Sequence, residues 1–583
     1  MLERADLIAN LLQLGIASTL TGIMLLALWR VVRAGAPGWA LAVVLITPLV
    51  VAYLNVGYRE TGYHGFMHAS FVYATAAGGL SPENPLVAGQ QLYYPFLHHW
   101  LLAQAMTVLP MTPGVGFAAT NLAAMVATTL LLLGIVRQVS DSKRFAVLAT
   151  VLALAGGPLL GGPVLAVLRG IGVPFEGRHI PYIKFAVFGQ NQLGLTFYVF
   201  ALWATLRWFN RRSLLALLGV VAGVAGAVVF YAFSWLTIIA SVGVMSLAFL
   251  ARGQPDRRTV FLLIGAVAVG SAVGLPYLVS FYLHRSGESG LVLFPGLTTM
   301  IRMLMISGLA VAPPLALLWV ERGSVAEWAR THRDTVRILV VWGIVPVGLA
   351  VVLGDATGNQ YKFLAHALIP LGILAAYALA ILGRPYPRLA TAILFFWLLP
   401  AAWHITTVVR TGWPVLDPTY ADGPYLRHVD RDEDALYTWI AGNTEPAAVF
   451  VDSRPTIAPL GRRSLYVATD VRRARLEREY PNAVAVLDGW NFDIDTLIRY
   501  AMGHPERLVR HRKEQVAALL DATAAAPTDS LLANVLADLD GRPVFIVARD
   551  TTLAARFRRS GNLEAVYRGA NASVFRVLVR SHD

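Results

Sequence analysis

Glu60, His64 and His68 are the residues whose types and spacing most directly suggest chemistry. They lie four positions apart, so on a helix they share one face. A carboxylate beside imidazoles can act as a general base when it lies within hydrogen-bond reach of the proton that it removes. The two histidines also permit a metal site, although the sequence offers no clear third ligand. The alternative is an interfacial helix whose polar face meets lipid headgroups, with Tyr58 and Tyr63 at the membrane boundary.

A second group of candidates follows in the segment 81–100, SPENPLVAGQQLYYPFLHHW. Its Pro and Gly residues prevent a continuous membrane span, and Pro95 can open a helix at its first turn. We expect residues 96–109 to form an amphipathic helix that lies along the membrane surface. Tyr94, His98 and His99 are candidates for contact with a lipid phosphate, but the simpler interpretation of His98 and His99 is that they are interfacial residues.

Cationic and amide side chains elsewhere could supply the phosphate contacts of a lipid-linked substrate. Arg and Lys pair with phosphate oxygens, and polar residues just inside a span are costly enough to be functional candidates by default. The alternative for each cation is a snorkelling membrane anchor. The candidates are Arg59, Arg178, His179, Lys184, Asn191, Arg302, Asn359, Gln360, Lys362 and His366.

These residues must be positioned by membrane-spanning helices. Of the 583 residues, 56% are hydrophobic and 14% are charged, which is outside the range of a soluble globule. A span needs roughly 20 apolar residues, and this criterion predicts about twelve spans. They lie near 8–31, 37–56, 115–136, 145–167, 191–209, 213–232, 234–251, 259–281, 299–320, 336–353, 363–382 and 388–409. The pair 213–251 turns tightly at Tyr231–Trp235.

The arginines and lysines between the spans give the protein an expected orientation. Cationic loops stay on the cytoplasmic side, so the other joints, both termini and the long loop 57–114 should face outward. The cationic joints are Arg30/Arg33, Arg137/Lys143/Arg144, Arg207/Arg211/Arg212, Arg252/Arg257/Arg258, Arg322/Arg330/Arg333/Arg337 and Arg384/Arg388. The net charge of +13 arises from the membrane part, which favours topology and attraction to anionic lipids over nucleic-acid binding. The chain has no cysteine, which excludes disulfides and thiol chemistry.

This orientation limits the choice of a catalytic carboxylate. Most acidic residues before position 411 lie beside Arg in the expected cytoplasmic joints or near the N-terminus. The acidic residues on the expected outer face are Glu60, Glu83, Glu176, Glu288 and Asp355. Glu60 is the first candidate because of its histidine neighbours, and Asp355 is the alternative.

The chain changes character after residue 410. A polar segment with Pro and Gly leads into the tail, residues 411–583, which has soluble features. Brief apolar runs at 448–452, 464–468 and 544–548 predict strands, whereas 434–440, 493–502 and 514–525 look helical. The expected fold is therefore an α-helical polytopic membrane domain, residues 1–410, followed by an extracytoplasmic α/β domain.

These features resemble the GT-C membrane glycosyltransferases, which are polytopic enzymes that use polyprenyl-phosphate-linked sugars. The resemblance rests on the predicted topology, on Glu60 in RETGYH directly after a span, on PENPLVAGQQLYYPFLHHW, and on the start of the tail, DEDALYTWIAGNTEPAAVFV. Three features depart from the family. A lone Glu replaces the usual Asp or acidic pair, the Tyr-Pro-Pro motif reads Tyr-Tyr-Pro-Phe, and an additional span precedes the one that leads into the loop.

The resemblance implies a hexosyl or pentosyl transferase of the bacterial inner membrane. It would move a sugar from a polyprenyl-phosphate donor to an extracytoplasmic glycan, lipid or protein in cell-envelope and cell-wall polysaccharide synthesis. Glu60 would act as general base, with His64 orienting the acceptor or the base. The leaving lipid phosphate needs cationic donors, for which the candidates are Arg178, Lys184, Arg302 and Lys362.

The resemblance implies no certain cofactor, and a divalent metal stays open. Two other classes of protein remain as alternatives. A lipid-linked-sugar flippase would place polar groups near mid-bilayer and show paired broken helices, of which the sequence shows few signs. A non-catalytic envelope-assembly protein would use the tail as a binding module.

Overall fold

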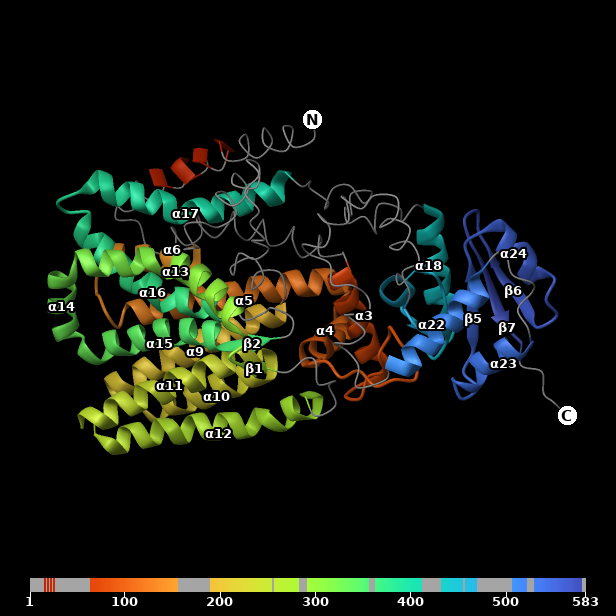
Figure 1. Ribbon diagram of the computed structural model, residues 1–583, viewed down its shortest axis with the longest axis horizontal. Helices are drawn as coiled ribbons and strands as arrows, with labels where there is room; N and C mark the ends of the chain where they lie inside the picture. Colours follow the sequence, from red (N-terminus) through yellow and green to blue (C-terminus); the bar gives the residue numbers. More distant parts are fainter. Residues whose placement is uncertain are drawn as a thin grey trace. The chain divides into compact units, whose positions relative to one another are not determined.

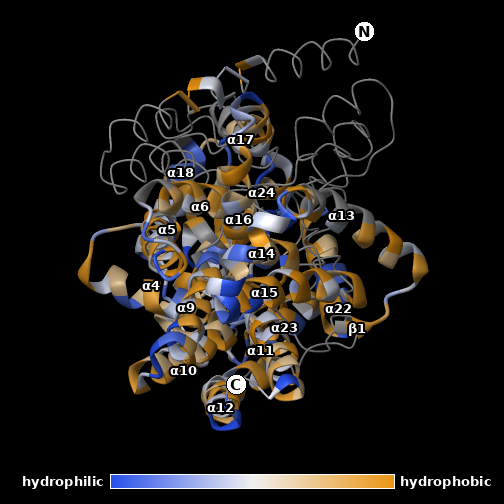
Figure 2. Cartoon of the chain, turned by 90° about the vertical axis from the view of Figure 1, so that its left-hand side faces the viewer, coloured by the Kyte–Doolittle hydropathy of each residue, from blue (hydrophilic) through white to orange (hydrophobic). Residues whose placement is uncertain are grey.

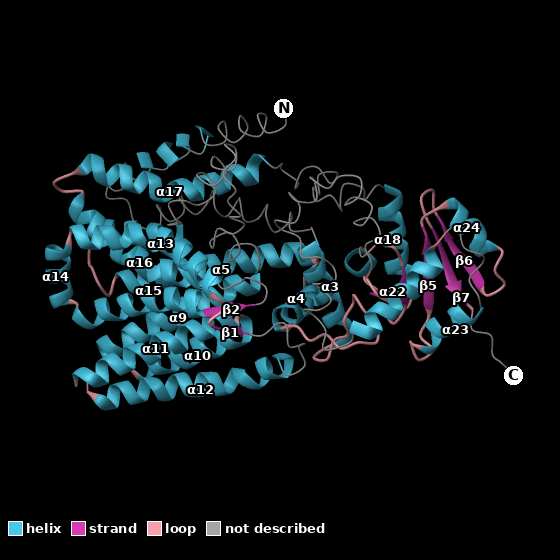
Figure 3. Cartoon of the chain, viewed as in Figure 1, coloured by secondary structure: helices cyan, strands magenta, loops and turns pink. Residues whose placement is uncertain are grey.

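The computed structural model describes residues 63–155, 189–253, 256–282, 291–355, 362–410, 431–454, 457–468, 506–521 and 529–578, with a few positions between 15 and 26. Most of these residues are helical (Figures 1 and 3). By their contacts, the described residues of 118–278 and 288–413 form one compact unit, here the helical unit. Those of 57–117, 279–287 and 414–583 form a second, here the mixed unit.

The helical unit is built from long helices and one short strand pair. Strands β1 (Leu291–Leu293) and β2 (Leu353–Asp355) pair in antiparallel fashion, with Leu291 opposite Asp355. The helices are α5 (Pro113–Val136), α6 (Lys143–Ala155), α9 (Gly189–Arg211), α10 (Leu214–Phe230), α11 (Ala232–Arg252), α12 (Arg257–Tyr282), α13 (Leu297–Val320), α14 (Arg322–Thr331), α15 (Arg333–Val352), α16 (Lys362–Leu382) and α17 (Pro387–Arg410).

Five helices of the described chain are long and apolar enough to cross a membrane: 113–136, 232–252, 257–281, 333–352 and 362–382. Shorter apolar helices cover 145–154, 214–230 and 387–399. The expected spans 8–31 and 37–56 lie largely outside the described residues, as does the second half of 145–167. The chain is therefore a mostly helical protein with several candidate spans, and the number twelve remains a prediction.

Helix α16 lies at the centre of the helical unit because it is apolar on every side. Its residues are buried without a break from Phe363 to Ala376, which is typical of a helix enclosed by others. It packs against α15, α6 and α13. In contrast, α12 leaves Phe261, Val269 and Val273 exposed, as expected of a helix surface that meets lipid. In Figure 2, the helices of this unit are coloured mainly as hydrophobic, and hydrophilic residues lie around α14.

The mixed unit combines a sheet with short helices. Its sheet has the order β4-β3-β5-β7-β6, in which β3 runs parallel to β4 and β5, whereas β7 is antiparallel to β5 and β6. The strands are β3 (Val449–Val451), β4 (Ser464–Leu465), β5 (Val544–Ala548), β6 (Leu563–Arg568) and β7 (Ser573–Val577). The helices are α3 (Tyr63–Gly78), α4 (Leu97–Val108), α18 (Arg431–Asn443), α22 (Glu506–Leu520), α23 (Asp529–Ala537) and α24 (Thr551–Arg558), with a π-helical turn η4 (Ile457–Gly461).

The expected elements of the tail agree with the structure where it describes them. The segments 448–452, 464–468 and 544–548 contain β3, β4 and β5, and 434–440 and 514–525 overlap α18 and α22. The expected helix 493–502 lies outside the described residues. Strands β6 and β7 and helices α23 and α24 were not predicted, because their short segments carry little periodicity of their own.

The long first loop packs against the tail within the mixed unit. The backbone amide of Ala88 donates to the Leu465 carbonyl at 2.7 Å, Leu465 donates to Pro85 at 2.9 Å, and Ala468 donates to Leu86 at 2.7 Å. The loop thus continues the backbone pairing of the sheet beyond β4. The division that places loop 57–114 in the membrane domain 1–410 stays a prediction, and within the mixed unit the described part of this loop contacts the tail.

Candidate functional site

Three buried histidines of the first loop meet in the mixed unit. Helix α3 supplies His68, and α4 supplies His98 and His99, with 4%, 3% and 0% of their surface exposed. His68 Nδ1 lies 2.7 Å from His99 Nε2. Tyr94 packs edge-on against both rings of this pair, with ring centroids 5.7 Å from His68 and 6.0 Å from His99. The structure therefore brings together four of the candidate residues from two separate sequence segments.

Apolar side chains enclose this histidine cluster, defined as His68, His98 and His99. Phe71 lies edge-on to His68 and His99, with centroids 6.1 and 5.6 Å away. The Phe117 ring also contacts the cluster, with its centroid 5.6 Å from that of the His98 ring. Such walls exclude water, so the hydrogen bond inside the cluster is stronger than one made at the surface.

Burial keeps the cluster neutral at physiological pH. It lowers the pKa of His68 to about 3, with a further contribution from His98, and it lowers the pKa of His98 to about 4. The pKa of His99 also falls well below its usual value, through burial and then through His68 and His98, although the Phe96 carbonyl acts in the opposite direction. Neutral imidazoles each keep one donor and one acceptor nitrogen, so they can hold or pass a proton without carrying a charge.

The burial corrects the interpretation of His98 and His99 as interfacial residues. Their segment does form a helix, α4, close to the predicted bounds 96–109. However, the helix turns both histidines inward and leaves Leu101 and Val108 exposed. The two rings do not lie on the surface of the described structure, where a headgroup would touch them directly.

The described part of α3 gives the Glu60–His64–His68 series a helical setting. His64 and His68 fall four residues apart on α3, so their backbone positions share one face. Glu60 and Arg59 lie outside the described residues, as does the side chain of His64. Among the described residues, no group of three or more His, Cys, Asp or Glu side chains is placed to hold a metal ion.

A second group of candidates lies in the helical unit, where the first turns of α11 and α16 contact α9. His366 Nε2 lies 2.8 Å from Ser234 Oγ, and His366 Nδ1 lies 3.1 Å from the Lys362 carbonyl. The Tyr198 hydroxyl donates to the His366 carbonyl at 3.1 Å. His366 is thus a fully buried histidine with both ring nitrogens engaged by the protein, which fits a positioning role better than direct contact with a lipid phosphate.

Lys362 stands at the first turn of α16 beside two aromatic rings. Its ammonium nitrogen lies 5.6 Å from the Tyr231 ring centroid and 5.1 Å from that of Phe233. Cation–π contacts of this kind fix the direction of a flexible lysine. Ser234, Tyr198 and Phe233 were not singled out in the sequence, because nothing in their local pattern separates them from ordinary residues of apolar helices.

The remaining candidates are placed by their backbone or lie outside the described residues. Asp355 is the last residue of β2, Asn191 belongs to the first turn of α9, and Arg302 belongs to α13, but their side chains are not described. Those outside the described residues are Arg178, His179, Lys184, Asn359 and Gln360.

Comparison with known proteins adds one likeness. No protein-family model and no curated protein matches the chain. Among solved structures, the chain is similar to ArnT. The crystal structure in question is that of ArnT from Cupriavidus metallidurans in the apo state, with 13% sequence identity, a TM-score of 0.47, and coverage of 92% of this chain and 98% of that chain.

Proposed function

We propose that this protein is a GT-C-type glycosyltransferase of the bacterial inner membrane. It transfers a sugar from a polyprenyl-phosphate donor to an extracytoplasmic glycan, lipid or protein acceptor in cell-envelope synthesis. The observation that carries the proposal is the meeting of the two loop motifs. The series Glu60–His64–His68 and the segment that contains Tyr94 and His99 are distant in sequence, and the His68–His99 contact of 2.7 Å joins them.

Glu60 acts as the general base. It removes the proton of an acceptor hydroxyl while that oxygen forms a bond to the anomeric carbon of the donor sugar. The bond from the anomeric carbon to the phosphate oxygen breaks, and the lipid phosphate leaves with the electron pair. Because a phosphate is already stable as an anion, it requires cationic hydrogen-bond donors rather than a strong acid.

Lys362 is the best-described candidate for the leaving phosphate. It stands at the end of a candidate span, where the phosphate of a membrane-embedded donor resides, and Tyr231 and Phe233 fix its direction. The further candidates for this role are Arg178, Lys184 and Arg302. His366 holds the first turn of α16 through its contacts with Ser234 and the Lys362 carbonyl.

The histidine cluster positions the base rather than reacting itself. The His68–His99 contact fixes α3 against α4, and α3 begins three residues after Glu60. Breaking the contact is therefore expected to lower kcat through misplacement of Glu60, because small errors in the position of a base reduce the rate strongly.

The test is a transfer assay on the full chain purified in detergent, with a panel of radiolabelled polyprenyl-phosphate sugars. We expect the parent to transfer or hydrolyse at least one donor and Glu60→Gln to lose at least about a hundredfold in kcat. Glu83→Gln is the matched control, because Glu83 is an acidic loop residue that the structure engages with Arg542 at 2.8 Å. It should keep kcat within a few fold.

The outcomes separate the competing assignments. If Asp355→Asn abolishes turnover while Glu60→Gln does not, the enzyme class stands and the base is Asp355. If a folded parent neither binds nor turns over any donor, the glycosyltransferase proposal is overturned. Movement of a labelled lipid-linked sugar across proteoliposomes, without any transfer, would favour the flippase.

A further inference from the structure

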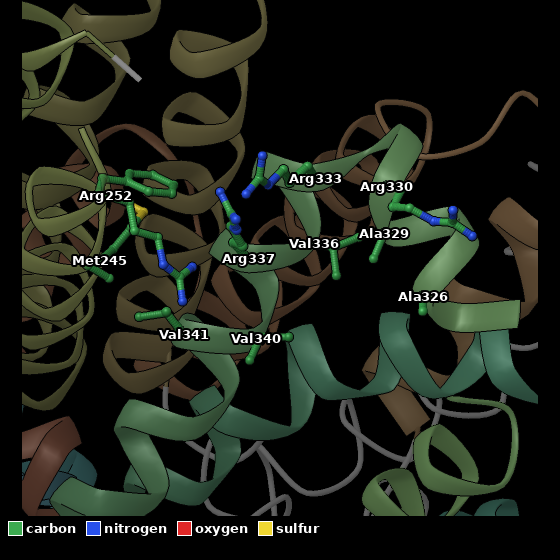
Figure 4. Close-up of a pocket in the computed structure, with 12 residues that line it drawn as sticks. Met245, Arg252, Ala326, Ala329, Arg330, Arg333, Val336, Arg337, Val340 and Val341 are labelled. Carbon is green, nitrogen blue, oxygen red and sulfur yellow. The ribbon is translucent and has the colours of Figure 1, made fainter. Parts of the chain in front are cut away.

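A cavity of about 500 Å³ opens in the helical unit between α11, α14 and α15. One part of its wall is apolar, formed by Met245, Phe249, Val336, Val340 and Val341. The other part carries four arginines, Arg252, Arg330, Arg333 and Arg337. Figure 4 shows that the side chains of Arg252, Arg333 and Arg337 gather on one side, whereas that of Arg330 extends away from them.

The charges around this cavity are poorly balanced. Arg337 pairs with Asp334 at 3.5 Å, and that carboxylate is 43% exposed. Arg333 and Arg252 act on Arg337 as like charges. Across the part of the chain that the structure describes, Arg252, Arg330 and Arg333 have no carboxylate within ion-pair distance. An arrangement of repelling cations around a cavity is stabilised when an anion enters it.

The arginine-rich α14 is held in place by its own packing. Trp328 is buried, donates its ring N–H to the Val139 carbonyl at 3.3 Å, and stacks on Tyr377 with ring centroids 4.0 Å apart. These contacts leave Ala326, Ala329 and Arg330 facing the cavity. Positive charge that only sets the orientation of a membrane protein can lie on any solvated segment. It requires neither a buried tryptophan that fixes the segment nor apolar side chains beside the arginines.

We infer that this cavity binds the phosphate headgroup of an anionic membrane lipid, independently of the proposed transfer reaction. The guanidinium groups match phosphate oxygens in bidentate geometry. The N-terminus of α15, a helix of 20 residues that begins at Arg333, adds its positive dipole. The lipid chains continue along Val340 and Val341, towards the apolar middle of α15. The expected side is cytoplasmic, where anionic lipids attract basic segments.

A lipid is favoured over a soluble phosphate compound because of the second wall. A free phosphate needs only the arginines, whereas Met245, Phe249 and the three valines offer it no polar partner. These side chains belong to two candidate spans, 232–252 and 333–352. Only a ligand with both a charged head and apolar chains uses both walls.

The test compares binding of lipids by the full chain in detergent, by native mass spectrometry and by thermal shift. The triple variant Arg252→Gln/Arg333→Gln/Arg337→Gln should weaken binding of phosphatidylglycerol at least tenfold. The matched control is Arg257→Gln/Arg258→Gln/Arg322→Gln, which removes the same charge from joints at the same end without touching the cavity wall. It should keep binding within about twofold of the parent.

Each outcome supports or overturns the inference. If both triple variants lost phosphatidylglycerol binding equally, the lipid would be attracted by the general positive charge of the surface, and the inference would be overturned. The lipid assignment would be overturned if inorganic phosphate or glycerol 3-phosphate stabilised the protein as much as phosphatidylglycerol does. It would also be overturned if the protein bound phosphatidylcholine as well as it binds phosphatidylglycerol. If the triple variant fails to fold, the exposed Arg333→Gln and Arg257→Gln form the deciding pair, with the same expected difference in direction.

Discussion

At the scale of single residues, His98 combines burial with an unsatisfied nitrogen. Its Nε2 has no hydrogen-bond partner among the described groups, and its ring packs against Phe117. A buried polar atom without a hydrogen bond lowers the free energy of unfolding. An apolar side chain of similar shape removes this penalty. We expect His98→Leu to leave the stability at pH 7.5 unchanged or slightly higher, as measured by thermal unfolding of the purified protein.

The same residue should contribute to acid sensitivity. The pKa of His98 is lowered to about 4 in the folded state, from an ordinary value of roughly 6.5. The folded state therefore binds fewer protons than the unfolded state between these values. The titration of His98 therefore leaves the free energy of unfolding unchanged above pH 6.5 and lowers it as the pH falls towards 4, by up to about 1.4 kcal/mol per pH unit.

His98→Leu should thus reduce the fall in melting temperature between pH 7.5 and pH 5. His68 and His99 keep part of the sensitivity, since their pKa values are also lowered by burial. His511→Leu, which changes an exposed histidine of α22, serves as the control and should retain the full acid sensitivity of the parent. An unchanged pH dependence in His98→Leu would show that this histidine is not a buried neutral group.

At the scale of elements, Arg512 joins the first loop to the tail. This buried side chain of α22 donates to the carbonyls of Ala88 at 2.6 Å and Tyr466 at 3.1 Å, and lies 3.6 Å from Asp538. Removing the guanidinium leaves its carbonyl and carboxylate partners without their hydrogen-bond donor. Arg512→Met should therefore lower the free energy of unfolding by about 2–3 kcal/mol. Hydrogen exchange should show lost protection in residues 82–92.

The control for this prediction is Arg510→Met, which removes an exposed arginine two residues away on the same helix. It should change stability by less than about 0.5 kcal/mol and leave exchange in residues 82–92 as in the parent. If both variants lost protection equally, the positive charge of α22 would protect residues 82–92, and the hydrogen bonds of Arg512 to the loop would not be the cause.

The centre of the helical unit depends on a close approach at Gly372. A Cβ atom at this position of α16 would lie 2.9 Å from the backbone of Ala153 and from the Leu152 carbonyl on α6. Backbone atoms cannot give way as a flexible side chain does, so Gly372→Ala should destabilise the protein by about 1–3 kcal/mol. Gly348→Ala on α15, where a Cβ meets nothing within 4 Å, should be neutral or stabilising. Thermal unfolding in one detergent compares the two variants.

The sequence predicted elements better than it predicted their contacts. The sequence predicts a tight turn at Tyr231–Trp235 between two apolar runs. In the structure, α10 ends at Phe230 and α11 already begins at Ala232, so the break is confined to Tyr231. The burial of His98 and His99 could not be read from α4 alone, since it depends on α3 and Phe117. The pairing of residues 85–88 with 465–468 left no local signal, because backbone hydrogen bonds between distant segments impose no residue pattern.

The candidate site was predictable to a similar degree. The spacing of His64 and His68 anticipated that they share a face of α3, since helical periodicity is a local property. Tyr94 and His99, the partners of His68, belong to a distant segment, and no sequence pattern indicates that His68 and His99 lie 2.7 Å apart. The sequence indicates His366 because a polar residue in a span is costly, but its partners Ser234 and Tyr198 depend on the packing of α11 and α9 against α16.

At the scale of the whole molecule, the charges of the joints predict which side of the membrane each part faces. The distribution of arginines predicts that the joint with Arg137, Lys143 and Arg144 is cytoplasmic and that the tail is outside. Because the chain has no cysteine, single cysteines can report on this directly. Ser142 is exposed in the cationic joint, and Ala570 is exposed in the turn between β6 and β7.

A membrane-impermeant maleimide should label Ala570→Cys on intact spheroplasts and Ser142→Cys only after permeabilisation. Thr331→Cys, exposed at the end of α14, should behave as Ser142→Cys does, and the cysteine-free parent gives the background. Labelling of Ser142 and Ala570 from the same side would mean that an even number of spans separates them, against the predicted odd number. Reversed labelling would place the arginine-lined cavity outside, where the cytoplasmic lipid headgroups proposed for it could not reach, so this one measurement bears on both proposals.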